Sequence, residues 1–254
     1  MLNLPYSMKL AFMTDVHANL VALEAALQDM NAQGVTRIIH GGDAIGIGPW
    51  PRETLERLHA LENRLVPIMG NHDAWYAFGY PHTDDLWLHP NEIQHSDWVH
   101  EQLGESFKPW IKTWPYKMRE TVHGLDLGFA HYGLKALPDR AGYPLYHKFI
   151  EDPRAQDLDE LFADFPVDLM FYGHHHPEST VKGRALYMNP GALGCSPTPH
   201  ARYILLELHE NGSYTLEPRA PEYDDTVLQR AFEEKRVPER EFIRKAFFQG
   251  HFEG

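Results

Sequence analysis

Cysteine is almost absent from this sequence, because Cys195 is the only one in 254 residues. A chain with one thiol cannot form an intrachain disulfide, so disulfide-stabilised folds are excluded. Such sparse use of cysteine is typical of proteins kept in a reducing compartment. We therefore expect a cytoplasmic location.

Basic residues and long apolar runs are also scarce. Lysine and arginine total 23 against 36 aspartates and glutamates, a formal net charge of −13. This charge opposes nonspecific binding to nucleic acid or an anionic membrane, although bound divalent cations would reverse the field locally and admit a small phosphoester. No stretch approaches the roughly 18 apolar residues of a membrane span, and residues 1–7 are too short and too weakly apolar for a secretory signal. We expect neither nucleic acid nor a membrane as a partner.

Sequence repeats and low-complexity linkers are not evident, which predicts a single domain over residues 1–254. Within it, residues 74–114 are rich in aromatic side chains. This density suits an insertion over a site, a dimer surface, or simple packing of a helical excursion. Residues 223–248 have a helical composition interrupted by Pro238, and we expect a C-terminal helical extension with a solvated charged face.

Polar side chains follow three predicted strands in the first third of the chain, at the point where each strand ends. The predicted strand 9–14 is followed by Asp15 and His17, and the strand 37–40 by Asp43. The strand 65–69 is followed by Asn71, His72 and Asp73. Helices are expected between the strands, the first capped by Asn19 and ended by Gly34, the second beginning at Pro51. The alternation predicts an α/β fold with these polar residues at the carboxyl ends of strands, where open α/β sheets place their sites.

Further along the chain, two apolar runs lead into histidines. His131 follows 125–130, and the cluster from His174 to His176 follows 167–172. Hairpins are predicted at 121–130 and at 202–218, the latter turning at Asn211 and Gly212. We expect these later strands to form a second sheet.

Each of these segments has an ordinary structural interpretation when taken alone. An Asp or His at a strand end can cap the next helix, a turn rich in Gly, Asn and Asp is a common exit from a strand, and most of the 17 histidines should be surface or core residues. All the segments together, in this order and each after a strand, favour a metal site instead. Their carboxylate, amide and imidazole groups supply enough donors for two borderline cations, and thiolates are not required.

At this point the sequence resembles the calcineurin-like metallophosphoesterase superfamily, whose pattern is Asp-x-His, Gly-Asp, Gly-Asn-His-Asp/Glu, His and Gly-His-x-His. The resemblance extends over about 9–208, and the stretches 42–49 and 189–192 are similar to the bacterial and archaeal phosphodiesterase branch. It implies two mixed β-sheets packed face to face and flanked by helices. The residues it implies as ligands are Asp15, His17 and His176 for one metal, Asn71, His131 and His174 for the other, and Asp43 as the bridge between them.

The resemblance also implies a chemistry. Two divalent cations, most simply manganese with iron or zinc as alternatives, would generate a metal-bound hydroxide that attacks phosphorus in a single displacement. His72 would be free of metal and placed to stabilise charge on phosphorus or to protonate the leaving oxygen. Asp73 could orient His72 or only stabilise the turn, and His175 could point outward as a bystander or exchange places with a ligand.

Several hypotheses about function stay open within this family. The continuation after Asp43 lacks the phosphate-gripping Arg of the phosphoprotein phosphatases, which disfavours that activity. A small phosphodiester or nucleotide is the leading substrate, with a phosphomonoester as the alternative. A noncatalytic scaffold resembling the retromer subunit is the other alternative, although His72 is retained here and replaced there. Trp75, Tyr76 and Tyr80 could stack a nucleobase, and a homo-oligomer is compatible with the sequence.

Overall fold

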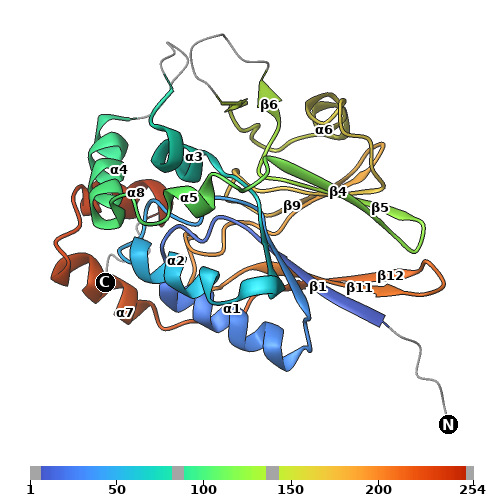
Figure 1. Ribbon diagram of the computed structural model, residues 1–254, viewed down its shortest axis with the longest axis horizontal. Helices are drawn as coiled ribbons and strands as arrows, with labels where there is room; N and C mark the ends of the chain where they lie inside the picture. Colours follow the sequence, from blue (N-terminus) through green and yellow to red (C-terminus); the bar gives the residue numbers. More distant parts are fainter. Residues whose placement is uncertain (1–6, 82–88, 136–142, 250–254) are drawn as a thin grey trace.

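Two five-stranded mixed sheets pack face to face, with helices on the outer side of each (Figure 1). This computed structural model describes residues 7–81, 89–135 and 143–249. The predicted fold class, a sheet sandwich flanked by helices, is confirmed. Most of the segment considered for a secretory signal, and residues 82–88 of the aromatic-rich segment with Trp87, lie outside the described residues.

The first sheet is built around β1, which is parallel to β2 and antiparallel to β11; β2 is in turn parallel to β3, and β11 antiparallel to β12. Its strands in spatial order are β12 (Tyr214–Arg219), β11 (Tyr203–His209), β1 (Ser7–Met13), β2 (Arg37–His40) and β3 (Leu65–Pro67). The three parallel strands therefore end at one edge of the sheet.

The second sheet has the same mixed character, since β5, β8 and β10 are parallel while β4 and β9 are antiparallel edge strands. Its strands in spatial order are β4 (Lys117–Val122), β5 (Leu125–Ala130), β8 (Leu169–Phe171), β10 (Leu186–Asn189) and β9 (Ser179–Lys182). A separate two-stranded hairpin is formed by β6 (Leu134–Lys135) and β7 (Leu145–Tyr146).

The helices of the described part of the chain are α1 (Leu20–Ala32), α2 (Pro51–His59), the 3₁₀ helix η1 (Glu62–Arg64), α3 (Asn71–Phe78), α4 (Pro90–Leu103), α5 (Lys108–Ile111), α6 (Ala155–Leu161), α7 (Asp225–Glu234) and α8 (Arg240–Phe247). The Asn19 side chain accepts a hydrogen bond from the Ala22 amide, and Pro51 is the first residue of α2, as predicted. None of the helices within these ranges combines the length and apolar character needed to cross a membrane.

Alternation along the central strands explains why the sheets form a sandwich. In β1, Leu10 and Phe12 point into the core between the sheets, whereas Ala11 and Met13 point toward the core under the helices. Phe12 packs against Phe129 and Phe171 of the second sheet, with ring centroids 6.0 and 5.4 Å apart. The shared apolar layer therefore fixes the two sheets relative to each other.

The expectation that the hairpin of β11 and β12 belongs to the second sheet is wrong, because this hairpin extends the first sheet. Ala11 of β1 lies opposite Leu205 of β11. Ile204 and Leu206 face the core between the sheets, while Leu205 faces the helices. β11 is thus covered on both faces and pairs with β1 on one side and β12 on the other. Alternation in the sequence identifies the hairpin but carries no information about its partner.

The aromatic-rich segment 74–114 contributes α4, α5 and most of α3, which lie together at one end of the sandwich (Figure 1). Tyr76 donates a hydrogen bond to the carbonyl of Gly104, and Trp110 and Trp114 pack edge to face at 4.9 Å. These three aromatic side chains thus pack within the helical excursion, and the role of the segment as a whole stays a prediction.

Candidate metal centre

The candidate residues lie in loops at the carboxyl ends of five strands, β1, β2 and β3 in the first sheet and β5 and β8 in the second. Backbone hydrogen bonds connect these loops: the Asp15 amide donates to Gly42 at 2.9 Å, and the Gly173 amide donates to His131 at 2.8 Å. A third bond runs between the sheets, from the His174 amide to Asp15 Oδ2 at 3.1 Å. Residues far apart in the sequence are thereby fixed around one point.

One group of donors comprises Asp15, His17 and His176. The two Nε2 atoms of His17 and His176 lie 3.0 Å apart, and Asp15 Oδ1 lies 3.6 and 3.7 Å from them. Asp15 and His17 are fully buried, while His176 is partly exposed. Three donor atoms that converge in this way form one face of a coordination shell.

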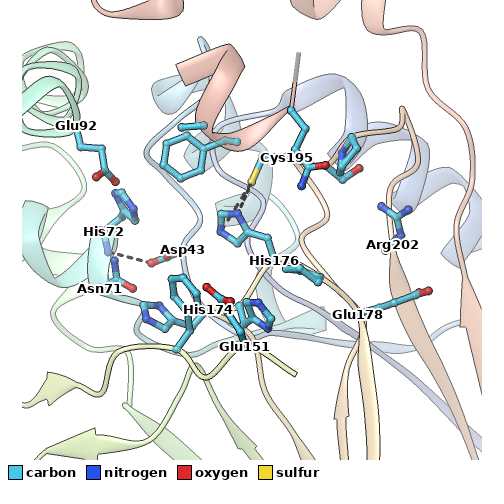
Figure 2. A pocket seen from close by; sticks show the side chains of 18 of the residues that line it. Asp43, Asn71, His72, Glu92, Glu151, His174, His176, Glu178, Cys195 and Arg202 are labelled. Carbon is cyan, nitrogen blue, oxygen red and sulfur yellow. Dashed lines mark hydrogen bonds between the residues drawn. The ribbon is translucent and has the colours of Figure 1, made fainter. Parts of the chain in front are cut away.

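A second group comprises Asn71, His131 and His174. His131 Nε2 lies 3.0 Å from Asn71 Oδ1, and ligand atoms of His131, His174 and Asp43 lie within 4.8 Å of one another. All of these side chains are buried. Figure 2 shows Asp43, Asn71 and His174 on one wall of the cavity that contains the site.

Asp43 lies between the two groups. Its Oδ2 is 3.9 Å from His17 Nε2 in the first group and 3.3 Å from His131 Nε2 in the second. Its other oxygen, Oδ1, accepts a hydrogen bond from the His72 amide at 2.9 Å. One carboxylate oxygen is thus within reach of both sets of imidazoles.

The donor set fits divalent cations by its chemistry. Asp15 Oδ1 is buried and accepts no hydrogen bond from the residues that the structure describes, an arrangement that is costly unless a cation meets the oxygen. Nδ1 of His17 faces the Ile45 carbonyl at 3.1 Å, and Nδ1 of His131 faces that of Gly41 at 3.0 Å. Those contacts place the proton on Nδ1 and leave the Nε2 lone pair for coordination.

Burial lowers the pKa of an imidazole in this site, whereas the negative charge of Asp43 raises it. Burial lowers the pKa of His174 and that of His72 to about 3, so both rings are neutral at pH 7. Burial also opposes the charged form of His131, but the Asp43 carboxylate outweighs it and raises the pKa of His131 to about 9. A proton on His131 would therefore compete with a cation, and cation binding would release it.

Four of the site residues have left-handed backbone conformations that are uncommon for side chains other than glycine. Their φ angles are 53° at Asp15, 48° at His17, 57° at Asp43 and 69° at His174. Each such conformation costs on the order of 1 kcal/mol and persists only where surrounding contacts impose it. Strain concentrated in these loops is typical of a functional site.

His72 is buried beside the centre, and one of its ring nitrogens lies within 4.8 Å of ligand atoms of His17 and Asp43. Its ring packs edge to face against His17 at 5.2 Å and lies 4.7 Å from the ring of Trp75. Figure 2 shows the Glu92 carboxylate pointing toward the His72 imidazole. Gly46, at φ 90°, leaves room for the ring, because a Cβ there would lie 2.6 Å from His72 Nδ1. The imidazole is therefore positioned from several sides beside the two donor groups.

The structure distinguishes between the two roles considered for Asp73. Its carboxylate accepts hydrogen bonds from the backbone amides of Gly70, Asp43 and Ala44, at 3.0, 2.8 and 3.1 Å. These bonds stabilise two ligand loops, and so the Asp73 side chain has the structural role, stabilising the turn that begins at Gly70. His175 stacks on Phe149 at 5.1 Å, away from the converging donor atoms.

A cavity of about 670 Å³ opens onto the centre, a volume typical of small-molecule sites. Trp75 lines it, whereas Tyr76 and Tyr80, the other two residues considered for base stacking, do not. No motif in the sequence points to three other lining residues, Phe149, Cys195 and Phe247. Each comes from a segment without a ligand motif.

Cys195 contacts a candidate ligand directly. Its buried Sγ lies 3.2 Å from His176 Nδ1 (Figure 2), where it can accept a hydrogen bond from the ring N–H and so direct Nε2 toward the other donors. Burial raises the pKa of the Cys195 thiol, so it stays protonated at neutral pH.

Replacing Cys195 by alanine is expected to weaken binding of one Mn²⁺ about tenfold, because His176 loses its hydrogen-bond acceptor. Cys195→Ser, which keeps an acceptor of similar size, should restore most of the affinity. Calorimetric titration of the metal-free variants with Mn²⁺ measures both effects. Equal affinities in the alanine variant and the parent would show that Cys195 does not position the ligand.

Comparisons with known proteins agree with this geometry. Residues 8–211 match the calcineurin-like phosphoesterase superfamily domain. An uncharacterised protein of Methanocaldococcus jannaschii is 24% identical over 246 residues, covering 91% of this chain and 94% of its own. A metallophosphoesterase of Sphaerobacter thermophilus is 26% identical with a TM-score of 0.66, covering 95% of this chain and 99% of its own. A hypothetical protein of Pyrococcus horikoshii has the same fold, with a TM-score of 0.73 at 17% identity, covering 94% of this chain and 98% of its own. The chain belongs to the calcineurin-like phosphoesterase superfamily.

Proposed function

We propose that the protein is a dinuclear-metal phosphoesterase that hydrolyses a small phosphoester, with a phosphodiester or nucleotide as the preferred class. The observation that carries this proposal is the position of Asp43 Oδ2, within 3.9 Å of His17 Nε2 and 3.3 Å of His131 Nε2. Asp15, His17 and His176 would hold one cation. Asn71, His131 and His174 would hold the other.

Two divalent cations supply, when bound, a water of lowered pKa and a clamp on the phosphoryl oxygens. The chain contributes a rigid shell, because the ligand loops are fixed by backbone hydrogen bonds and by the Asp73 carboxylate. Burial of most of the donors limits their contact with water to the side that faces the cavity. The carboxylates of Asp15 and Asp43 would supply the negative charge that holds the cations in place.

His72 would act on the substrate rather than on the cations. With its pKa lowered to about 3 by burial, the ring is a neutral hydrogen-bond donor at pH 7. This state favours stabilisation of charge on a phosphoryl oxygen, and a bound phosphate would raise the pKa and so permit proton transfer to the leaving oxygen.

Three properties support an enzyme over a noncatalytic scaffold of the same fold: His72 is retained, a cavity opens onto the donors, and the ligand loops are strained. Manganese suits the mixed oxygen and imidazole donors, with iron and zinc as alternatives set by availability. A cytoplasmic location, a small phosphoester substrate with neither nucleic acid nor a membrane as a partner, and compatibility with a homo-oligomer remain part of the proposal.

Removal of divalent cations should abolish hydrolysis, since the donors alone provide no Lewis acid to activate water and bind the phosphoryl oxygens. Protein stripped with a chelator is expected to lose at least about 99% of its turnover of bis(p-nitrophenyl) phosphate, a loss of several kcal/mol of transition-state stabilisation. Adding Mn²⁺ should restore activity, with p-nitrophenyl phosphate hydrolysed more slowly. Full activity in stripped protein would refute the metal-dependent mechanism, and a preference for the monoester would refute the diesterase assignment.

A further inference from the structure

The C-terminal helix α8 forms part of the cavity wall, although it lies beyond the residues matched to the family domain, which end at 211. Phe247 is the large side chain that α8 presents there, half-buried and with its ring 5.9 Å from that of His176. Ala246 and Gln249 line the same wall. An aromatic surface therefore borders the first group of metal donors.

Several contacts hold α8 in place. The ring of Phe242 stacks on His89 at the start of α4, with centroids 4.6 Å apart and planes 18° apart. Arg244 forms an ion pair with Glu233 of α7 at 2.8 Å, and Ile243 is buried in the core under the helices. The wall formed by Phe247 is thus part of the packed fold.

A second aromatic surface borders the other group of donors. Phe149, in the loop after β7, lies 6.4 Å from the ring of His174 and stacks on His175. It is half-buried and lines the cavity. Trp75 is less suited to contact a ligand, because it is only 5% exposed and packs between His72 and Tyr80.

The charged side chains of the cavity limit what else a substrate can carry. Outside the metal donors, the cavity is lined by four carboxylates, Glu92, Glu151, Asp152 and Glu178, and by one cation, Arg202. A substituent with further phosphates would meet this excess of negative charge, whereas an apolar one would not. Apolar rings on both sides of the centre complement an uncharged group.

We infer that Phe149 and Phe247 form a subsite for an aromatic or other apolar substituent on the phosphorus that the metal centre binds. This inference rests on the proposed function and specifies its substrate class. A phosphomonoester has one ester group, which departs with the leaving oxygen. A phosphodiester carries a second group, and that group would occupy the space beside Phe247. The subsite therefore provides a reason for preferring diesters.

The test compares two diesters that share a leaving group, phenyl p-nitrophenyl phosphate and methyl p-nitrophenyl phosphate, with the Mn²⁺-loaded protein. Phe247→Ala is expected to lower kcat/KM for the phenyl ester about tenfold, the size of a lost aromatic contact, and to change that for the methyl ester less than about twofold. Phe247→Leu, which keeps apolar volume, should show a smaller loss. Lys245→Ala, on the exposed side of the same helix, is the matched control and should change neither.

Binding of unreactive phosphonates separates this inference from the proposed hydrolysis. Phenylphosphonate should bind the Mn²⁺-loaded parent more tightly than methylphosphonate, and Phe149→Ala and Phe247→Ala should each reduce that preference. If the preference is present but no diester is hydrolysed, the subsite stands and the proposed function falls. If hydrolysis occurs and the phenyl-to-methyl ratio is the same in parent, Phe149→Ala and Phe247→Ala, the subsite is refuted and the function stands.

Discussion

Asp43→Asn is expected to leave the protein folded but unable to retain its pair of cations. The substitution keeps the shape of the side chain and its hydrogen bond with the His72 amide, but it removes the negative charge between the two groups of imidazoles. Loss of several kcal/mol of charge stabilisation corresponds to roughly a thousandfold fall in turnover. Metal analysis of the purified variant, together with kcat for a diester in excess Mn²⁺, measures the effect.

Asp126→Asn is the matched control for this experiment. Asp126 lies on β5, the strand that leads to His131, but at its opposite end, where it pairs with Arg119. Losing this solvent-screened ion pair should change stability little and leave metal content unchanged. An Asp43→Asn protein that retained two cations and near-parental turnover would contradict the bridging role.

The second large effect is expected at His72. His72→Ala should keep both cations, because each cation retains all the ligands proposed for it, yet lower kcat by roughly a hundredfold or more, as the removal of a catalytic proton donor does. His72→Asn, which retains a hydrogen-bond donor, should recover part of the loss if the ring stabilises charge on a phosphoryl oxygen. Steady-state kinetics with parallel metal analysis distinguishes these outcomes.

His175→Ala provides the comparison, since His175 is another imidazole of the same region that faces away from the donors and stacks on Phe149. Its removal should change kcat by less than about threefold for methyl p-nitrophenyl phosphate, whose small substituent makes little use of the Phe149 subsite. Full activity in His72→Ala would eliminate the proposed role of His72. A loss in His175→Ala as large as that in His72→Ala would instead indicate an exchange of ligands within the histidine cluster.

The sequence carried more information about the ligand loops than about the walls of the cavity. Asp15, Asp43 and Asn71 each follow an apolar run, and the carboxyl ends of parallel strands meet at one edge of a sheet, so their convergence could be predicted. The structure places these three side chains where that argument expects them. Their coordination of metal stays a prediction, because it depends on ions and not on the path of the chain.

The remaining features depend on contacts between distant segments. Phe247 reaches the cavity only because α8 packs against α4 and α7, and nothing in residues 240–247 signals a ligand. Cys195 is informative only once His176 is known to lie 3.2 Å away. The hairpin of β11 and β12 was expected in the second sheet, but it belongs to the first, where β11 pairs with β1. Alternation specifies which residues of a strand are buried but not which strand lies alongside.

Anomalous scattering from crystals of the Mn²⁺-loaded protein, collected on both sides of the manganese edge, tests the central claim most directly. Two peaks about 3.5 to 4 Å apart are expected, one on each side of the Asp43 carboxylate, with His17 and His176 beside one and His131 and His174 beside the other. A single peak, or a pair of peaks with Asp43 in contact with neither or only one, would contradict the account.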